Sequence, residues 1–324
     1  MGTVTNSGTA ALQFAGDQPA QDVSYGNRFF HPCMAVLTAV LFLVAIVCIA
    51  FFHYRLPFSQ AASVAGFVPF TGAIAYCWWA RRYKLLQACS LPFWASVVST
   101  LLKFPLYIAA RSQVALKDNA LAHIDRILRI EVPPILHFMA PHPWARAALA
   151  LSYGTLFPLM VVAAILPPLR FRFTAAKELI VATCFATLVG APLFALVPAI
   201  GPWVVYGYPP APLQAQTQAL FLSLRAGGVH LIDLNEPGFV CFPSFHVLLA
   251  VLSAVALCSI KPLRIPAILV AALITVSTLT TGWHYVADVI GGLALAAISV
   301  AASKAYSRWE TARLRGGPRA YRIS

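Results

Sequence analysis

The chain has 324 residues, of which 60% are hydrophobic and only 10% are charged, and its mean hydropathy is +0.77. Soluble domains do not reach this composition, so a soluble globular protein is excluded. Stretches of about 19 residues with little charge recur along the chain, each long enough to cross ~30 Å of hydrocarbon. We therefore expect an all-α polytopic membrane bundle of about eight transmembrane helices and no nucleic-acid partner, despite a formal net charge of +13.

The first 112 residues are expected to contain a tail and three spans. Residues 1–30 are rich in Gly, Thr, Ala and Gln and predict a disordered cytoplasmic tail. Residues 31–112 are expected to hold three N-terminal transmembrane helices. The third contains Lys103, whose charge indicates either a phosphate ligand or a side chain that reaches the headgroups. The apolar runs are Met34–Phe52, Ala61–Ala80 and Leu91–Ala110.

Residues 113–303 are expected to form a membrane domain with the other five spans. It opens on Lys117–Glu131, where apolar and charged residues alternate, so we expect a helix that lies on the membrane or caps the bundle. Gly201–Phe239, which contains Arg225, is expected to be a long functional loop. The predicted spans are Ala147–Pro167, Leu179–Ile200, one that begins near Pro243, one that ends near Gly282, and Tyr285–Ser303.

The basic residues indicate the orientation of these spans. With both termini in the cytoplasm, the clusters at 81–84, 170–177 and 261–264 and the basic tail at 304–324 all lie inside. This distribution follows the positive-inside rule. It places His246, His284 and Arg225 together on the non-cytoplasmic face.

The two histidines and their neighbours form a candidate catalytic group. His284 and Asp288 are four residues apart, so on a helix they share a face, and the carboxylate can orient the imidazole as a nucleophile or base. His246 lies near the start of its helix, where free backbone N–H groups favour a bound phosphate. Ser244 offers a hydroxyl and Arg225 a planar guanidinium for phosphate oxygens. Together these residues predict a phosphoryl-transfer site.

Two alternatives stay open for parts of this group. Asp288 could pair with Lys103 or Arg225 inside the bundle, and Gly291 and Gly292 could mark a close contact between helices. A transport or lipid-translocating protein whose histidines relay protons is the alternative function. Against it, the chain shows no obvious internal repeat of the transporter kind.

No metal site and no cofactor are expected. The seven cysteines show no paired or CxxC spacing, so we expect buried apolar positions, without a disulfide framework or a zinc site. His137 and His142 have a spacing that metal ligands can use, but prolines interrupt any common helical register around them. Hydrogen-bond donors and an arginine can neutralise the charge that develops on phosphate without a metal.

Two segments, PSFH and GWHYVADVIGG, resemble the second and third motifs of the type 2 phosphatidic acid phosphatase superfamily. Their histidines, His246 and His284, are 38 residues apart. The chain is most similar to the branch with the aureobasidin-sensitive inositolphosphorylceramide synthases and their bacterial relatives. That branch carries a proline-rich element similar to Pro198–Trp203. The resemblance covers roughly residues 115–303, but the Lys-x6-Arg-Pro first motif of the superfamily is absent.

The resemblance implies a six-helix phosphatase-like core within residues 113–303 and a lipid phosphate or phospholipid as substrate. It implies that His284 is the nucleophile and forms a phosphohistidine, that Asp288 orients it, and that His246 is the acid toward the leaving group. Ser244 and Arg225 would hold the phosphate. The expected location is a bacterial inner membrane, and the phosphate acceptor is either water or an alcohol.

Overall fold

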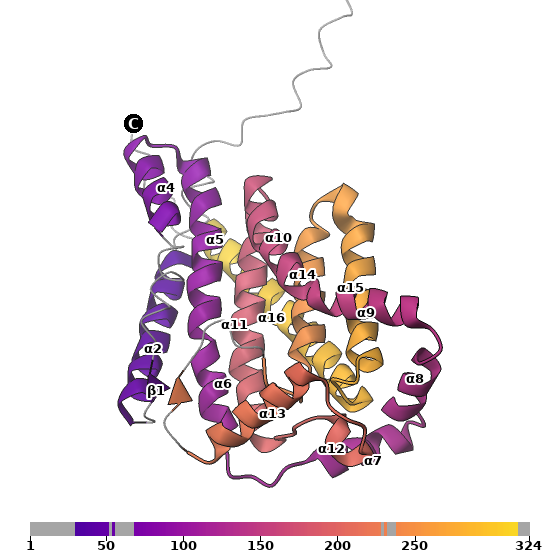
Figure 1. The fold of residues 1–324 in the computed structure, drawn as a ribbon. Coiled ribbons are helices and arrows are strands. Elements are labelled where there is room, and N and C mark those ends of the chain that lie inside the picture. The colour runs from indigo at the N-terminus through magenta and orange to yellow at the C-terminus, as the bar shows by residue number, and fades with distance from the viewer. Residues whose placement is uncertain (1–29, 52–53, 56–67, 228–229, 232–237, 317–324) are drawn as a thin grey trace, which may run out of the picture.

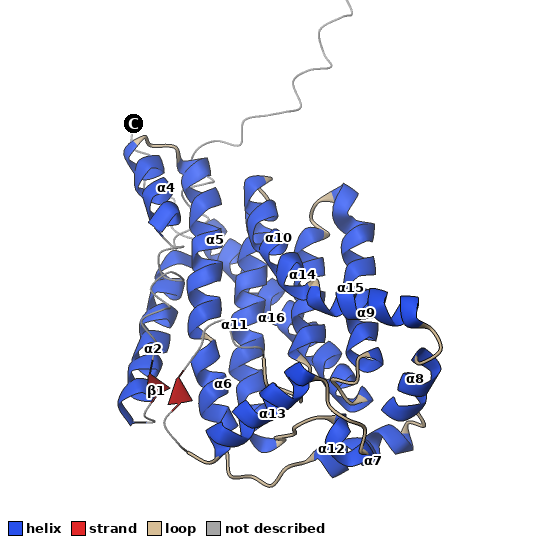
Figure 2. Ribbon diagram, viewed as in Figure 1, coloured by secondary structure: helices blue, strands red, loops and turns tan. Residues whose placement is uncertain are grey.

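The computed structural model describes residues 30–51, 54–55, 68–227, 230–231 and 238–316 (Figure 1). The predicted N-terminal tail, the first part of the second predicted span, and Arg319 and Arg322 of the basic tail lie outside these residues. Helices account for nearly all of the regular structure (Figure 2). The two strands are β1 (Tyr54–Arg55) and β2 (His230–Leu231), which form one short parallel pair.

Four helices are described in the N-terminal part. They are α2 (Phe30–Phe51), α4 (Val68–Trp79), α5 (Tyr83–Leu101) and α6 (Lys103–Ala110). Helices α5 and α6 together form one apolar stretch of 28 residues, Tyr83–Ala110. This stretch packs against α11 (Phe173–Leu196), so the N-terminal helices lie against the later part of the bundle.

The later part of the chain supplies the other long helices. They are α9 (Pro143–Gly154), α10 (Leu156–Leu169), α11, α14 (Phe245–Leu257), α15 (Arg264–Thr280) and α16 (Val286–Gly316), with the short 3₁₀ turn η2 (Lys261–Leu263) before α15. Helix α14 packs against α10, α11, α15 and α16, which makes it the central helix of this group.

The all-α polytopic architecture predicted from composition is confirmed. Among the described residues, five helical stretches are long and apolar enough to cross a membrane, and α9 with α10, bent by 42°, can count as a sixth. Helix α14 has 13 residues and is shorter than the span predicted there. At 1.5 Å per residue, α14 reaches only about 20 Å, less than the ~30 Å of a bilayer core.

Four of the described helices gather at one end of the bundle (Figure 1). They are α7 (Asp118–Ile127), α8 (Val132–Met139), α12 (Pro202–Tyr206) and α13 (Pro212–Arg225). The prediction of a long loop at 201–239 is therefore wrong over much of its length, because α12 and α13 lie within it. Both begin with proline. Proline suits the first turn of a helix because the N–H groups there have no acceptor within the helix, so no hydrogen bond is lost.

Helix α7 forms within the predicted segment Lys117–Glu131, and it buries two of its charged side chains. Asp118 and Asp125 are 4% and 0% exposed, whereas Ile124 and Ile127 are 42% and 66% exposed. In the structure the two aspartates share the buried face with Leu121 because backbone N–H groups of other segments bind them.

Candidate active site

The two histidines come together at one end of the bundle, as the sequence predicts. His246 is the second residue of α14, and His284 lies two residues before the start of α16. Helix α15 returns the chain from the far end of α14 and so brings the two segments to the same level. The ring centroids of His246 and His284 are 6.1 Å apart. A phosphorus atom bound between them could therefore meet one imidazole on each side.

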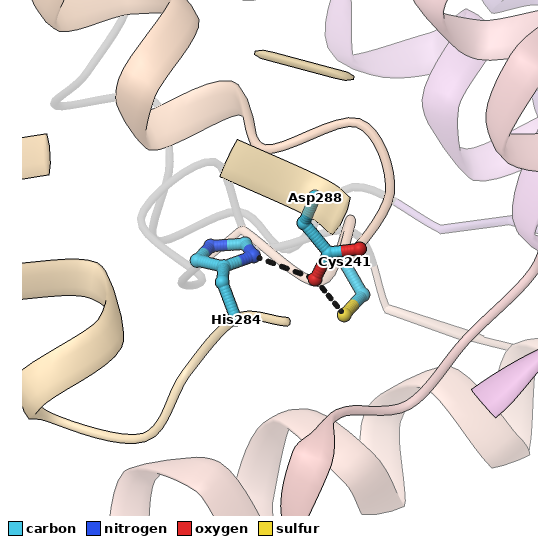
Figure 3. A group of neighbouring side chains, drawn as sticks. All are labelled: Cys241, His284 and Asp288. Atoms are coloured by element: carbon cyan, nitrogen blue, oxygen red, sulfur yellow. Dashed lines mark hydrogen bonds and ion pairs between the residues drawn. The ribbon is translucent and has the colours of Figure 1, made fainter. Parts of the chain in front are cut away.

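Asp288 holds His284 in place. Its Oδ2 atom lies 3.3 Å from Nδ1 of His284 and also accepts hydrogen bonds from the Tyr285 backbone N–H, at 2.9 Å, and the Cys241 thiol, at 3.0 Å (Figure 3). Because a carboxylate only accepts, it fixes the His284 proton on Nδ1 and leaves Nε2 bare. His284 is 3% exposed and Asp288 is fully buried. The predicted contact between these two side chains is confirmed.

Cys241 is more than the apolar filler that the sequence indicated. Burial raises the pKa of its thiol well above the usual range, and the neighbouring Asp288 charge adds to this effect. The thiol therefore stays protonated and serves as a hydrogen-bond donor to the carboxylate.

Ser244 joins the two histidine segments through the backbone. Its side chain caps α14 by accepting from the Val247 N–H, at 3.5 Å, and its own N–H donates to the Asp288 carbonyl, at 3.0 Å. A Cβ on Gly292 would lie only 2.5 Å from the Ser244 carbonyl oxygen. Gly292 thus allows α16 to approach the start of α14, which supports the helix-packing alternative alongside the catalytic one.

Tyr153 of α9 contacts both segments and was not predicted. Its ring stacks on His246, with centroids 4.1 Å apart and an 18° angle, and its hydroxyl lies 3.3 Å from Nδ1 of that histidine. The Tyr153 ring also stacks with Trp283, with centroids 5.7 Å apart and an 11° angle. Trp283 in turn meets Trp203 edge-on, with centroids 6.0 Å apart. These aromatic rings form one side of the histidine pair.

Asp118 and Asp125 of α7 accept hydrogen bonds from the segment that follows His284, and they were also missed as site residues. Asp118 accepts from the backbone N–H groups of Ile200 and Gly201, at 3.0 and 2.9 Å, so it holds the proline-rich element at Pro198–Trp203. Burial raises the pKa of both carboxyls, and the backbone N–H groups that they accept act in the opposite direction. Their spacing of seven residues, on one face with Leu121, was the signal available in the sequence.

The structure does not bring Arg225 to this group. Its guanidinium donates to the Val114 carbonyl, at 2.8 Å, and lies over the Phe221 ring, at 5.7 Å from the centroid. Arg225 is the last residue of α13, whereas Gln214 near the first turn donates to the Gly282 carbonyl, at 3.1 Å, beside the histidine segment. Residues 214 and 225 are about 16 Å apart along the helix axis.

Lys103 lies at the first position of α6, which packs against α2, α11 and α13. The two predicted cations are thus associated with the N-terminal side of the bundle, and the described hydrogen bonds of His284, Asp288 and Ser244 involve neither of them.

One group of side chains among the described residues has donor atoms close enough for a metal ion. Cys241, His284 and Asp288 each place one such atom within 4.8 Å of the other two (Figure 3). The hydrogen bonds to Oδ2 of Asp288 account for this proximity, because a thiol and an imidazole N–H both point at one oxygen. His137 and His142, the other pair that we considered, are not part of it.

Comparison with known proteins agrees with the geometry. A family model described as the PAP2 superfamily matches residues 119–302, which include both histidine segments, Asp125 and the proline-rich element. No curated protein and no solved structure shows significant similarity to the chain. Because the family match covers more than half of the 324 residues, the chain belongs to the PAP2 superfamily.

Proposed function

We propose that this protein is a membrane-embedded, metal-independent phosphatase or phospho-headgroup transferase that acts on a lipid phosphate through a phosphohistidine at His284. Membership of the PAP2 superfamily indicates a phosphatase or phosphotransferase type of activity. The observation that supports the specific mechanism is the pair of imidazoles 6.1 Å apart, one of them oriented by a buried carboxylate.

The first half of the reaction transfers the phosphoryl group to the protein. The bare Nε2 of His284 attacks phosphorus, the P–N bond forms, and the P–O bond to the leaving group breaks. His246 donates a proton to the leaving oxygen, and Asp288 stabilises the charge that develops on the His284 ring.

The second half releases the phosphoryl group. The oxygen of water or of an alcohol attacks phosphorus, His246 takes the proton from that oxygen, and the P–N bond breaks. Water as acceptor gives a phosphatase. A lipid or inositol hydroxyl gives a transferase of the inositolphosphorylceramide synthase kind, the branch that the sequence resembles.

Binding of the phosphate oxygens is assigned to the start of α14. The first N–H groups of a helix lack intrahelical partners and favour an anion, and Ser244 and His246 lie at this terminus. Arg225 and Lys103 stay predictions as further phosphate ligands. The basic clusters support cytoplasmic termini and a non-cytoplasmic active site, as the positive-inside rule predicts. A bacterial inner-membrane location stays a prediction.

The experiment is a substrate panel with protein purified in detergent. Release of inorganic phosphate is compared with headgroup transfer to added alcohols, in EDTA, for the natural sequence, His284→Ala and His246→Ala. We expect turnover in EDTA that each substitution abolishes while elution in size exclusion and thermal unfolding stay unchanged.

Three results would contradict the proposal. If His284→Ala turns over as fast as the natural sequence, His284 is not the nucleophile. Activity lost in EDTA and restored by Mg²⁺ or Zn²⁺ removes the metal-free mechanism. Proton-coupled transport by reconstituted protein without any phosphate chemistry favours the alternative, a transporter.

A further inference from the structure

The backbone that follows His284 is held entirely by carboxylates. The N–H of Tyr285 donates to Asp288, the N–H of Val286 to Oδ2 of Asp125, and the N–H of Ala287 to Oδ1 of Asp125, each at 2.9 Å. These three consecutive residues connect the proposed nucleophile to the aspartate that orients it. The catalytic turn, residues 284–288, is thus fixed at each of its internal N–H groups.

Asp125 acts on this turn from a distant helix. It belongs to α7, is separated from Val286 by 161 positions and is 0% exposed. Val286 and Ala287 are the first two residues of α16, whose N–H groups have no partner within the helix. A carboxylate at a helix N-terminus also interacts favourably with the helix dipole. Asp125 therefore caps α16 with both of its oxygens.

Helix α7 also fixes the other side of the turn. The Tyr285 hydroxyl donates to Asp118, at 3.2 Å, and also lies 3.1 Å from the Gly201 carbonyl. Asp118 and Asp125 are two helical turns apart on one face of α7. A single rigid helix consequently sets the position of the catalytic turn relative to the proline-rich element.

We propose that Asp125 is a positioning residue for phosphoryl transfer, which sets the geometry of His284 and Asp288 through the backbone of residues 286 and 287. This inference rests on the proposed function of His284. The hydrogen bonds of Asp125 go to the backbone of Val286 and Ala287 and not to His284, so we expect its contribution in the chemical step and not in substrate binding. A displacement of about 1 Å in a reacting group can lower a rate roughly 10²-fold.

The test is Asp125→Asn. Asparagine keeps the size of the side chain but replaces one acceptor oxygen with an NH₂ group, which then faces a backbone N–H donor. We expect kcat to fall about tenfold to a hundredfold while KM changes by less than about threefold, because the interaction acts through the reacting groups. His123→Asn, at an exposed position of the same helix, is the matched control and should leave both constants unchanged.

A double-substitution cycle separates positioning from a general loss of stability. If Asp125 acts through the His284–Asp288 pair, the effect of Asp125→Asn should shrink to less than about threefold in an Asp288→Asn background. Multiplicative losses in the double variant, or an unchanged kcat in Asp125→Asn, would overturn the inference. Thermal unfolding and size exclusion in detergent are measured for every variant.

Val286→Pro provides the second variant if Asp125→Asn does not fold. Proline suits the first position of a helix and removes the N–H that Oδ2 of Asp125 accepts, without a change on α7. It should lower kcat at constant KM, and an unchanged kcat contradicts the proposal. His284→Ala is assayed in the same series, so that the role of His284 as nucleophile and the role of Asp125 as positioning residue are tested separately. Activity there contradicts the proposed function, whereas an inactive His284→Ala beside a fully active Asp125→Asn contradicts only the role of Asp125.

Discussion

At the scale of single residues, the site depends on which polar atoms are already engaged. Oδ2 of Asp288 accepts from an imidazole, a thiol and a backbone N–H, so its position is fixed before substrate binds. A preorganised carboxylate of this kind can stabilise charge in the transition state without reorganising. Arg225, by contrast, uses its guanidinium within the protein, on the Val114 carbonyl and the Phe221 ring.

Arg225→Ala tests the role of this arginine. From its contacts we expect a loss of stability, seen as a lower unfolding temperature, and a less than tenfold change in kcat/KM of the folded protein. A donor aimed at transition-state charge would cost ~10²–10³ in rate. A loss of that size at unchanged stability would therefore identify Arg225 as the phosphate ligand that the sequence predicted. Lys103→Ala, assayed in parallel, applies the same criterion to the other candidate cation.

The sequence predicted the residues whose spacing is local and missed those brought in from other segments. His284 and Asp288 are four positions apart, so their spacing was enough to predict the contact, although His284 lies two residues before α16 begins. Asp125 reaches Val286 only because α7 packs beside α16, which no periodicity in either segment reveals. Arg225 was predicted to lie in a long loop on the face of the histidines, but it is the last residue of α13, and its guanidinium contacts Val114.

At the scale of secondary-structure elements, the contact between α14 and α16 brings the two histidine segments together. Gly291 and Gly292 lie where these segments meet, and added Cβ atoms would lie 2.7 Å from the Phe242 ring and 2.5 Å from the Ser244 carbonyl oxygen. Carboxylates are normally exposed, so the burial of Asp118 and Asp125 on α7 was not expected from the sequence. Here backbone N–H groups at the starts of other elements satisfy them.

Gly292→Ala tests this contact. The new methyl group would meet a backbone oxygen that cannot move without displacing the start of α14, so we expect a large loss of turnover together with reduced stability. Gly72→Ala in α4 is the matched control, because nothing lies within 4 Å of a Cβ there. It should be neutral or slightly stabilising, since alanine favours a helix more than glycine does. Equal turnover in the two variants would contradict the close contact.

At the scale of the whole molecule, the bundle separates the site from a buried ion pair near the other end of α16. Lys177 of α11 and Glu310 of α16 lie 3.3 Å apart and are each 6% exposed. Glu310 is about 33 Å along the helix axis from Asp288. Composition predicted the membrane bundle, but span lengths depend on where helices end, and α14 ends at Leu257, earlier than its apolar run indicates.

Lys177→Met tests the energetic role of this pair. Removal of one partner leaves a buried charge without compensation, so the free energy of unfolding should fall by about 3–5 kcal/mol. Lys177→Met combined with Glu310→Leu should recover much of that loss. Denaturation in detergent measures both variants. The kcat of the remaining folded protein should stay the same, and a selective loss of kcat would show that this end of α16 communicates with the site.

The central claim is that His284 carries the phosphoryl group, and the most direct measurement is identification of the phosphoenzyme. A single-turnover reaction with a radiolabelled lipid phosphate is quenched rapidly, and the labelled peptide is mapped by mass spectrometry. We expect the label on His284, in a bond that is labile in acid and stable in base. The label should be absent from His284→Ala and should form more slowly in Asp288→Asn. Label on any other residue, or natural turnover by His284→Ala, would contradict it.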